Sequence, residues 1–170
     1  MATDITINSL FPAVKSGQLS KQQTDIFNTT FIGIDFGTST TVVSVSHLDK
    51  ETKDIITKTL WLNQKQYDGT PMSSEKVPTV IAWYNNQLLV GQGAADLKHQ
   101  LKKGVNVWYS FKMELGEDLG SKYYNSELDR NNRYTILNPK DATKVFFQYL
   151  KGQIDRIVRD GNLPSNLQYA

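Results

Sequence analysis

Hydrophobic and polar positions alternate most clearly between residues 31 and 62. Two β-branched, apolar runs, FIGIDF and TVVSVS, lie on either side of the turn GTST at residues 37–40. Two such runs joined by a glycine turn are typical of a β-hairpin. A third apolar run extends from Ile55 to Leu62, after the polar stretch Asp49–Asp54. The pattern therefore predicts three sequential antiparallel strands.

A second hairpin and a short helix are predicted further along the chain. Residues 63–76 are polar and rich in turn formers, and strand character resumes in VPTVIAWY. Asn85 and Asn86 tolerate the positive φ of a two-residue turn, which predicts a return strand over Gln87–Val90. Apolar positions at helical spacing, Ala94, Leu97 and Leu101, predict a helix that ends at Gly104. Residues 105–137 show no clear period.

The strongest helix signal begins at Asn138. This residue is a preferred N-cap, Pro139 suits the first helical position, and apolar residues recur at helical spacing as far as Val158. Gly161 and Pro164 end the pattern. Residues 1–30 have no sustained period and are expected to be an N-terminal extension. The last residues, 166–170, are expected to be a polar lead-in to an element that the chain lacks.

Composition narrows the classes of partner. The 170 residues carry 19 Lys and Arg against 17 Asp and Glu, for a formal charge of +2, and neither sign forms a long block. We therefore expect no nucleic-acid partner and no membrane partner. The chain has no cysteine and only two histidines, which excludes disulfides, thiolate chemistry and Cys-based zinc sites. No apolar segment reaches the length of a membrane helix, and a cytoplasmic location is expected.

The aromatic residues are expected to pack in the core. Six of them lie at helical or strand spacing, which is typical of core packing. They are not interleaved with basic residues, which argues against a platform for stacking nucleic-acid bases. The residues concerned are Trp61, Trp83, Trp108, Phe146, Phe147 and Tyr149.

The segment Gly33–Thr40, GIDFGTST, is the main candidate for chemistry. It is neither a Walker A loop nor a dinucleotide fingerprint. Both of those motifs open a helix, whereas this segment lies between two strands, and it has neither the Walker A lysine nor the G-x-G-x-x-G spacing. Gly37 lets the backbone approach a ligand closely, so that the N–H groups of Thr38, Ser39 and Thr40 can point at phosphate oxygens. Asp35 beside a triphosphate would require a divalent cation, and we expect Mg²⁺ held through water. An ordinary hairpin with a solvent-exposed Asp35 is the alternative.

A family resemblance bears on this choice. The sequence IGIDFGTSTTVVSV resembles the first phosphate-binding segment of the heat-shock protein 70 (DnaK-like) and actin superfamily of ATPases. VPTVIAW, LVGQGAADL, FKMELG and NPKDATKVFFQYLK resemble later segments of the chaperone's first lobe, in the same order. The resemblance runs from about Phe31 to the end of the chain.

This resemblance implies roles for particular residues. Gly37, Thr38, Ser39 and Thr40 would hold the β- and γ-phosphates of ATP or ADP, and Asp35 would lie in the magnesium shell. Lys112, in FKMELG, is similar to the family's lysine that reaches the γ-phosphate and the attacking water. Its catalytic role would be to stabilise charge. A surface lysine is the alternative for Lys112.

The resemblance also implies an α/β fold of the ribonuclease H-like, actin-like ATPase kind, present as the first lobe only. Residues 31–62 and 138–170 would form part of its main subdomain, and residues 63–137 a smaller inserted subdomain. The chain would be a fragment that carries about half of an ATP site and is inactive alone.

Three functions remain as expectations. The first is an ATP-hydrolysing chaperone of the heat-shock protein 70 type, with unfolded client peptides and cochaperones bound through other regions. The second is an actin-like bacterial filament protein. The third is a small-molecule kinase of the same superfamily. Such kinases often carry a basic residue shortly after D-x-G-T, and the absence of Lys and Arg from Ser39 to His47 argues against this class.

Overall fold

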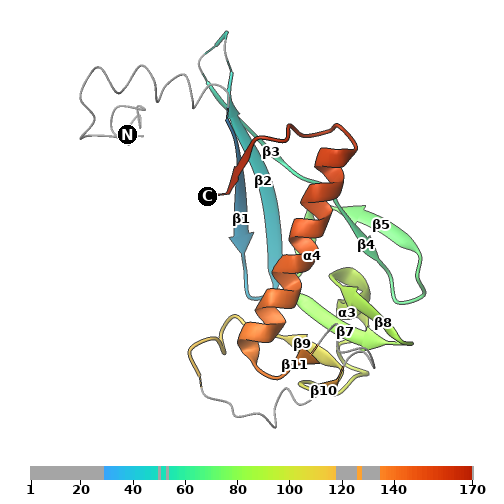
Figure 1. The fold of residues 1–170 in the computed structure, drawn as a ribbon. Coiled ribbons are helices and arrows are strands. Elements are labelled where there is room, and N and C mark those ends of the chain that lie inside the picture. The colour runs from blue at the N-terminus through green and yellow to red at the C-terminus, as the bar shows by residue number, and fades with distance from the viewer. Residues whose placement is uncertain (1–28, 50, 53, 118–125, 128–134, 170) are drawn as a thin grey trace, which may run out of the picture.

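The computed structural model describes residues 29–49, 51–52, 54–117, 126–127 and 135–169, and its elements are labelled in Figure 1. The chain forms a mixed α/β structure dominated by strands. In chain order the elements are β1 (Thr30–Phe36), β2 (Thr40–Leu48), β3 (Ile55–Thr59), β4 (Leu62–Lys65), β5 (Pro71–Ser74), β6 (Lys76–Pro78), β7 (Val80–Tyr84), β8 (Gln87–Val90), α3 (Gln92–Asp96), β9 (Val107–Tyr109), β10 (Ser126–Glu127), β11 (Thr135–Ile136), α4 (Pro139–Arg159) and β12 (Leu167–Tyr169).

The largest sheet has the order β12-β1-β2-β3, and β6 also pairs with β2. β1 and β2 are antiparallel over their whole length, from Thr30 opposite His47 to Phe36 opposite Thr41. β3 continues the antiparallel series, which confirms the three sequential strands predicted from the sequence. β12 lies parallel to β1 on its other side, so Leu167–Tyr169 form a strand themselves, and the prediction that residues 166–170 only lead into a missing element is wrong.

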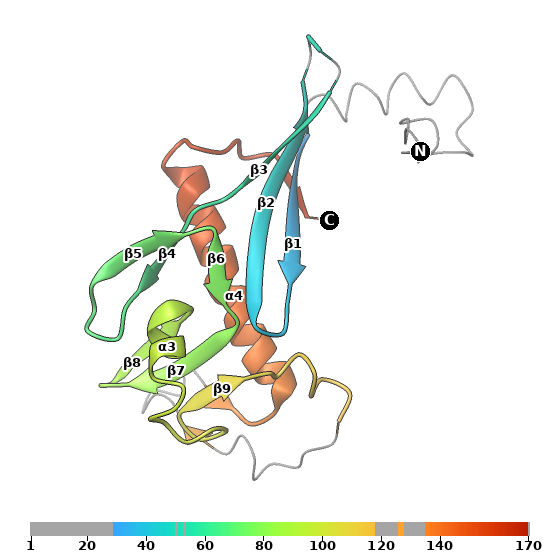
Figure 2. The same cartoon turned by 180° about the vertical axis from the view of Figure 1, so that it is seen from behind.

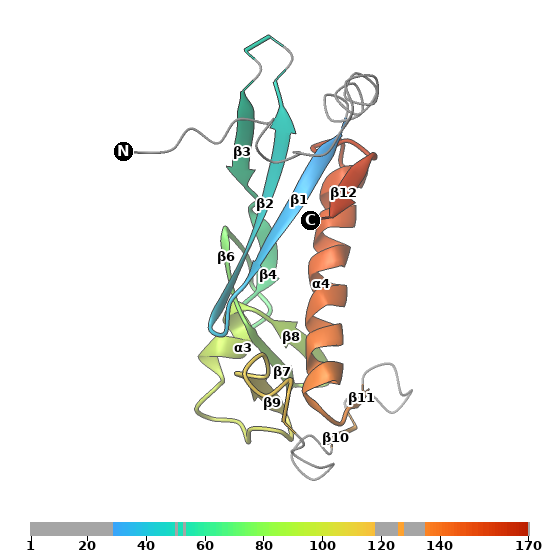
Figure 3. The ribbon, with the colours of Figure 1, turned by 90° about the vertical axis from the view of Figure 1, so that its left-hand side faces the viewer.

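Helix α4 packs along one face of this sheet, as the side view in Figure 3 shows. It begins as the sequence predicted: the Asn138 side chain accepts a hydrogen bond from the Asp141 amide at 2.9 Å, and Pro139 occupies the first turn. Gly161, with a φ of 76°, follows the helix end. Because apolar residues recur on one side of the helix, that side is buried and its opposite side faces solvent.

Of the smaller sheets, β7-β8-β9 and β10-β11 lie in the lower part of Figure 1, and β4-β5 lies to the right of α4. β7 pairs with β8 and β9, β4 pairs with β5, and β10 pairs with β11. The predicted Asn85–Asn86 turn is confirmed, since both residues have a positive φ, 48° and 59°. Such a turn matches the twist of the two strands that it joins.

One hydrophobic cluster joins the large sheet, α4 and the smaller sheets. Ile32 and Val43 of the large sheet, Phe146 and Leu150 of α4, and Trp108 of β9 are all fully buried in it. A second cluster lies between α3 and the β7-β8-β9 sheet (Figure 2). Because the first cluster is continuous, the strands near the N-terminal end of the described chain and helix α4 near its C-terminal end pack into one unit.

Three sequence predictions need correction. The third strand ends at Thr59, and Leu62 already belongs to β4. Helix α3 ends at Asp96 and not at Gly104, because the chain continues from Leu97 in turns with amide bonds back to the Leu97 carbonyl. Trp61 is 61% exposed between two strands instead of packing in the core.

Two further differences concern segments without a clear signal. The polar residues 63–76 form most of the β4-β5 hairpin, which the sequence pattern did not predict. The expectation of an N-terminal extension over residues 1–30 falls almost entirely outside the described residues.

Candidate functional site

The turn between β1 and β2 requires glycine. A Cβ atom on Gly37 would lie 2.2 Å from the Thr40 carbonyl oxygen, far inside van der Waals contact. A backbone atom of a strand cannot move away as a flexible side chain can. The position therefore accepts only hydrogen, and the chain reverses tightly enough for the turn to present its backbone.

Thr79, directly after β6, holds this turn from the neighbouring strand. Its hydroxyl donates to the Gly37 carbonyl at 2.9 Å, and its amide donates to the Ser39 carbonyl at 2.9 Å. The hydroxyls of Thr41 and Thr79 lie 2.9 Å apart. Because a hydroxyl has one hydrogen, the Thr41 hydroxyl is the donor in that pair. Thr41 and Thr79 are both buried.

Thr79 binds only carbonyl groups of the turn, so it leaves the amide groups of the turn free to donate to a ligand. Within the described residues, the amides of Thr38 and Ser39 donate to no acceptor. Ser39 and Thr40 are exposed and Thr38 is half-buried. Carbonyls fixed on one side and successive free amides on the other form the backbone arrangement that binds anions.

Lys112 reaches this turn from a distant part of the sequence. Its Nζ atom donates a hydrogen bond to the carbonyl oxygen of Phe36, 76 residues away in the chain. The same Nζ lies 5.5 Å from the centroid of the Phe36 ring. Figure 2 shows the segment that follows β9 passing below the β1–β2 turn. The ammonium group therefore stands at the base of the turn and remains exposed to solvent.

Aromatic packing explains why the two segments meet. The Phe36 ring lies 6.2 Å from that of Phe111, 5.9 Å from that of Phe146 and 5.0 Å from that of Phe147. Phe36 directly precedes Gly37, and Phe111 directly precedes Lys112. The rings of Phe36 and Phe111 pack against each other and against rings of α4. Because each of these two residues directly precedes a site residue, their packing brings the turn and the lysine together.

An ion pair also anchors the segment that carries Lys112. Nζ of Lys103 lies 2.6 Å from a carboxylate oxygen of Glu114, and both side chains are largely buried. The backbone turns sharply at Ser110, where φ is 60°. Phe111 is fully buried, so this short segment is held on both sides of Lys112.

Asp35 is the acidic residue nearest the turn. Its side chain is exposed on β1, where successive side chains alternate between the two faces of the sheet. Ile34 and Phe36 pack toward the α4 cluster, so Asp35 lies on the opposite face. No group of three or more metal-ligating side chains occurs among the described residues. A single carboxylate still suits Mg²⁺, which usually binds one or two carboxylates together with water and substrate phosphates.

The structure thus gathers most of the residues predicted from the sequence. Lys112 lies beside the turn 37–40, whereas Asp35, two residues before the turn, lies on the face of the sheet opposite the Phe36 ring that Lys112 contacts. Sequence reasoning missed Thr41 and Thr79, which fix the turn's carbonyls. The available signal was a lone Thr within the apolar run VPTVIAWY, because a buried hydroxyl must find a hydrogen-bond partner.

Comparisons with known proteins add no assignment. No protein-family model matches the chain, and no curated protein matches its sequence. In the described part of the chain, no helix is long and apolar enough to cross a membrane.

Proposed function

We propose that this chain supplies the first phosphate-binding loop of an actin-like ATPase of the heat-shock protein 70 type. The turn 37–40 would bind the β- and γ-phosphates of a magnesium nucleotide through its backbone amides and hydroxyls. Lys112 would add a positive charge beside the γ-phosphate. The parent protein would be an ATP-hydrolysing chaperone, as the family resemblance implies.

The position of Lys112 is the observation that carries this proposal. A surface lysine with no role would have no reason to be fixed at the base of a distant glycine turn. Here the Lys112 ammonium contacts the Phe36 carbonyl, and buried aromatic rings hold both segments. A cation beside unpaired amides is the combination that stabilises phosphate charge.

The sheet order supports the finer fold proposal. The large sheet has the order β12-β1-β2-β3: three antiparallel strands come first in the chain, and after the smaller sheets come the long helix α4 and a strand parallel to β1. A hairpin-rich sheet with the Asn138 helix packed on it is what the family resemblance implies for the main subdomain. We therefore propose that this mixed α/β architecture is the first lobe of an actin-like ATPase domain.

Magnesium would be held near Asp35. The chemistry supplied there by Mg²⁺ would be neutralisation of the charge on the phosphate oxygens. Asp35 would accept hydrogen bonds from its water shell, and the amides of Thr38 and Ser39 would orient the phosphates. Lys112 would stay positioned by its bond to the Phe36 carbonyl until a phosphate oxygen competes for it.

The affinity of this chain for nucleotide should be weak. Each charge-assisted contact contributes about 1.5–3 kcal/mol net. Two or three such contacts must offset roughly 4 kcal/mol or more of lost translational and rotational freedom. The expected dissociation constant for Mg-ATP is therefore about millimolar or weaker.

A titration of the 170-residue chain with Mg-ATP, followed by amide chemical shifts, tests the proposal. We expect the largest shifts at residues 37–40, with Lys112→Gln weakening the response and Lys140→Gln leaving it unchanged. Lys140 is an exposed lysine of α4 and serves as the matched control. Shifts centred elsewhere, or equal effects of the two substitutions, would refute the assignment. Micromolar binding would contradict the single-loop site.

A further inference from the structure

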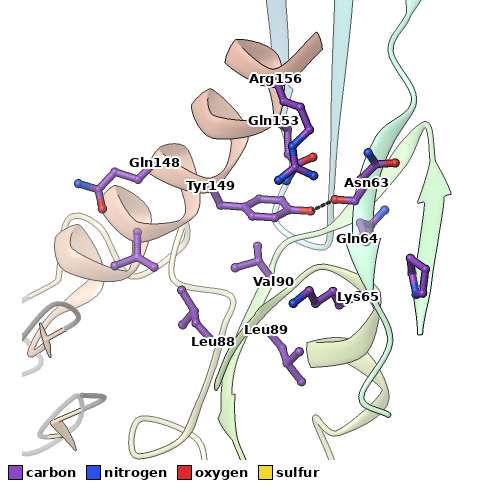
Figure 4. Close-up of a pocket in the computed structure, with 12 residues that line it drawn as sticks. Asn63, Gln64, Lys65, Leu88, Leu89, Val90, Gln148, Tyr149, Gln153 and Arg156 are labelled. Carbon is purple, nitrogen blue, oxygen red and sulfur yellow. Dashed lines mark hydrogen bonds between the residues drawn. The ribbon is translucent and has the colours of Figure 1, made fainter. Parts of the chain in front are cut away.

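A cavity of about 660 Å³ lies between α4 and the strands β4 and β8, and it shares no residue with the β1–β2 turn. Figure 4 shows its lining side chains. This volume is within the range of small-molecule sites. Neither the sequence patterns nor the proposed nucleotide site gives this cavity a role.

One part of the cavity is apolar. Leu88, Leu89 and Val90 of β8 and Val145 of α4 line it, and the ring of Tyr149 extends between the helix and β4. The Tyr149 hydroxyl donates to the Asn63 carbonyl at 2.6 Å. Burial raises the pKa of Tyr149 to about 12, so the hydroxyl stays neutral and keeps this bond at physiological pH. The ring is therefore a fixed apolar wall.

The other part of the cavity is cationic. Arg156 reaches toward the Tyr149 hydroxyl from α4, and Lys65 extends from β4 (Figure 4). None of the described residues that line the cavity is Asp or Glu. The arginine charge acts on the tyrosine, since it counters part of the rise in the Tyr149 pKa. Lys65 of β4 and Arg156 of α4 thus line the same cavity, and no carboxylate among the described lining residues neutralises them.

Arg156 differs from its neighbour on the same helix. Lys151 is neutralised by Asp155, with Nζ 2.7 Å from a carboxylate oxygen. Among the described residues, Arg156 has no ion-pair partner. Its planar guanidinium, which presents several N–H donors in a fork, suits a carboxylate or sulfonate group.

We propose that this cavity binds a small organic anion with an apolar ring. The anionic group would pair with Arg156, with Lys65 adding charge. The ring would lie against Leu88, Val90 and the Tyr149 ring. An ion pair with one side shielded by apolar walls is stronger than one in open water, because water screens it less.

Fluorescence titration of the 170-residue chain with 8-anilinonaphthalene-1-sulfonate tests this site. We expect saturable one-site binding that Arg156→Gln weakens about tenfold and Lys65→Gln weakens severalfold. Arg159→Gln and Lys76→Gln are matched controls, since both residues are exposed and outside the cavity lining, and both should leave the affinity unchanged. Circular dichroism should show the same fold in all four variants.

A neutral probe separates charge recognition from general apolar adsorption. N-phenyl-1-naphthylamine has the same aromatic body without the sulfonate and should bind at least about tenfold more weakly. Equal binding of the two probes, equal affinities in all variants, or no saturable binding would each overturn the proposal. Because Mg-ATP binding at residues 37–40 is measured separately, failure here leaves the nucleotide proposal standing.

Discussion

Thr79→Val removes the hydroxyl that holds the β1–β2 turn while keeping the β-branched shape of the side chain. The Thr79 hydroxyl donates to the Gly37 carbonyl and accepts from Thr41. Its loss leaves both groups without a partner, although the bond from the residue 79 amide to the Ser39 carbonyl persists. An unsatisfied buried polar group costs about 1–3 kcal/mol. Because the Gly37 carbonyl is only partly buried and its cost lies at the low end of this range, we expect Thr79→Val to lower the free energy of unfolding by about 2–4 kcal/mol.

Thr79→Ser is the control for this change. It keeps the hydroxyl and deletes one methyl group, which costs about 1 kcal/mol. Thr41→Val should also cost about 1 kcal/mol, because Thr79 can still donate to Gly37. The double variant Thr41→Val/Thr79→Val should cost less than the sum, since no buried hydroxyl is then left unpaired.

Urea unfolding at 25 °C, followed by far-ultraviolet circular dichroism, measures these differences. The reasoning requires Thr79→Val to be clearly less stable than Thr79→Ser. It is refuted if the two variants have the same stability, or if the costs of the two valine substitutions simply add.

Four other outcomes follow from the fold and from the proposed site. Tyr149→Phe removes a group whose pKa burial raises from 10 to about 12 in the folded state, so the stability of the wild type relative to this variant should be constant below pH 10. It should then fall by about 2.7 kcal/mol toward pH 12, because the unfolded chain loses the proton first, and urea unfolding at several pH values measures this. Asn138→Ala removes the cap on the Asp141 amide and should cost about 1 kcal/mol in the same assay, whereas Asn138→Asp should cost little. In a chain that supplies both lobes of the site, Lys112→Ala should lower ATP turnover by about 10²–10³-fold with a much smaller change in nucleotide affinity. In that chain Asp35→Ala should abolish magnesium-dependent turnover and leave the circular dichroism spectrum unchanged.

Elements with strong local signals could be predicted from the sequence. The Asn85–Asn86 turn and the N-cap at Asn138 each depend on chemistry within a few residues, and both occur in the structure. The β4-β5 hairpin could not be predicted in this way. Gln64 of β4 is buried although polar, because its amide donates to the Lys76 carbonyl and accepts from the Gln92 amide. Such partners are far away in sequence.

The same distinction applies to the candidate site. The glycine turn was visible as a local pattern, since Gly37 lies between two apolar runs. The place of Lys112 beside it came only from the family resemblance, because its position depends on ring contacts between three distant segments. Thr79 was missed because its partners, Gly37 in the β1–β2 turn and Thr41 on β2, are 42 and 38 residues away in the sequence.

Paramagnetic relaxation by Mn²⁺ in place of Mg²⁺ tests the nucleotide proposal most directly. Mn²⁺ broadens amide signals steeply with decreasing distance and would report where the metal–ATP complex sits on the 170-residue chain. The proposal predicts that small amounts of Mn-ATP first broaden the signals of residues 35–40 and 112, while Arg159 at the far end of α4 is unaffected. Broadening that is centred on any other segment, or that is the same with Mn²⁺ alone, would contradict the assignment of this turn to nucleotide phosphate.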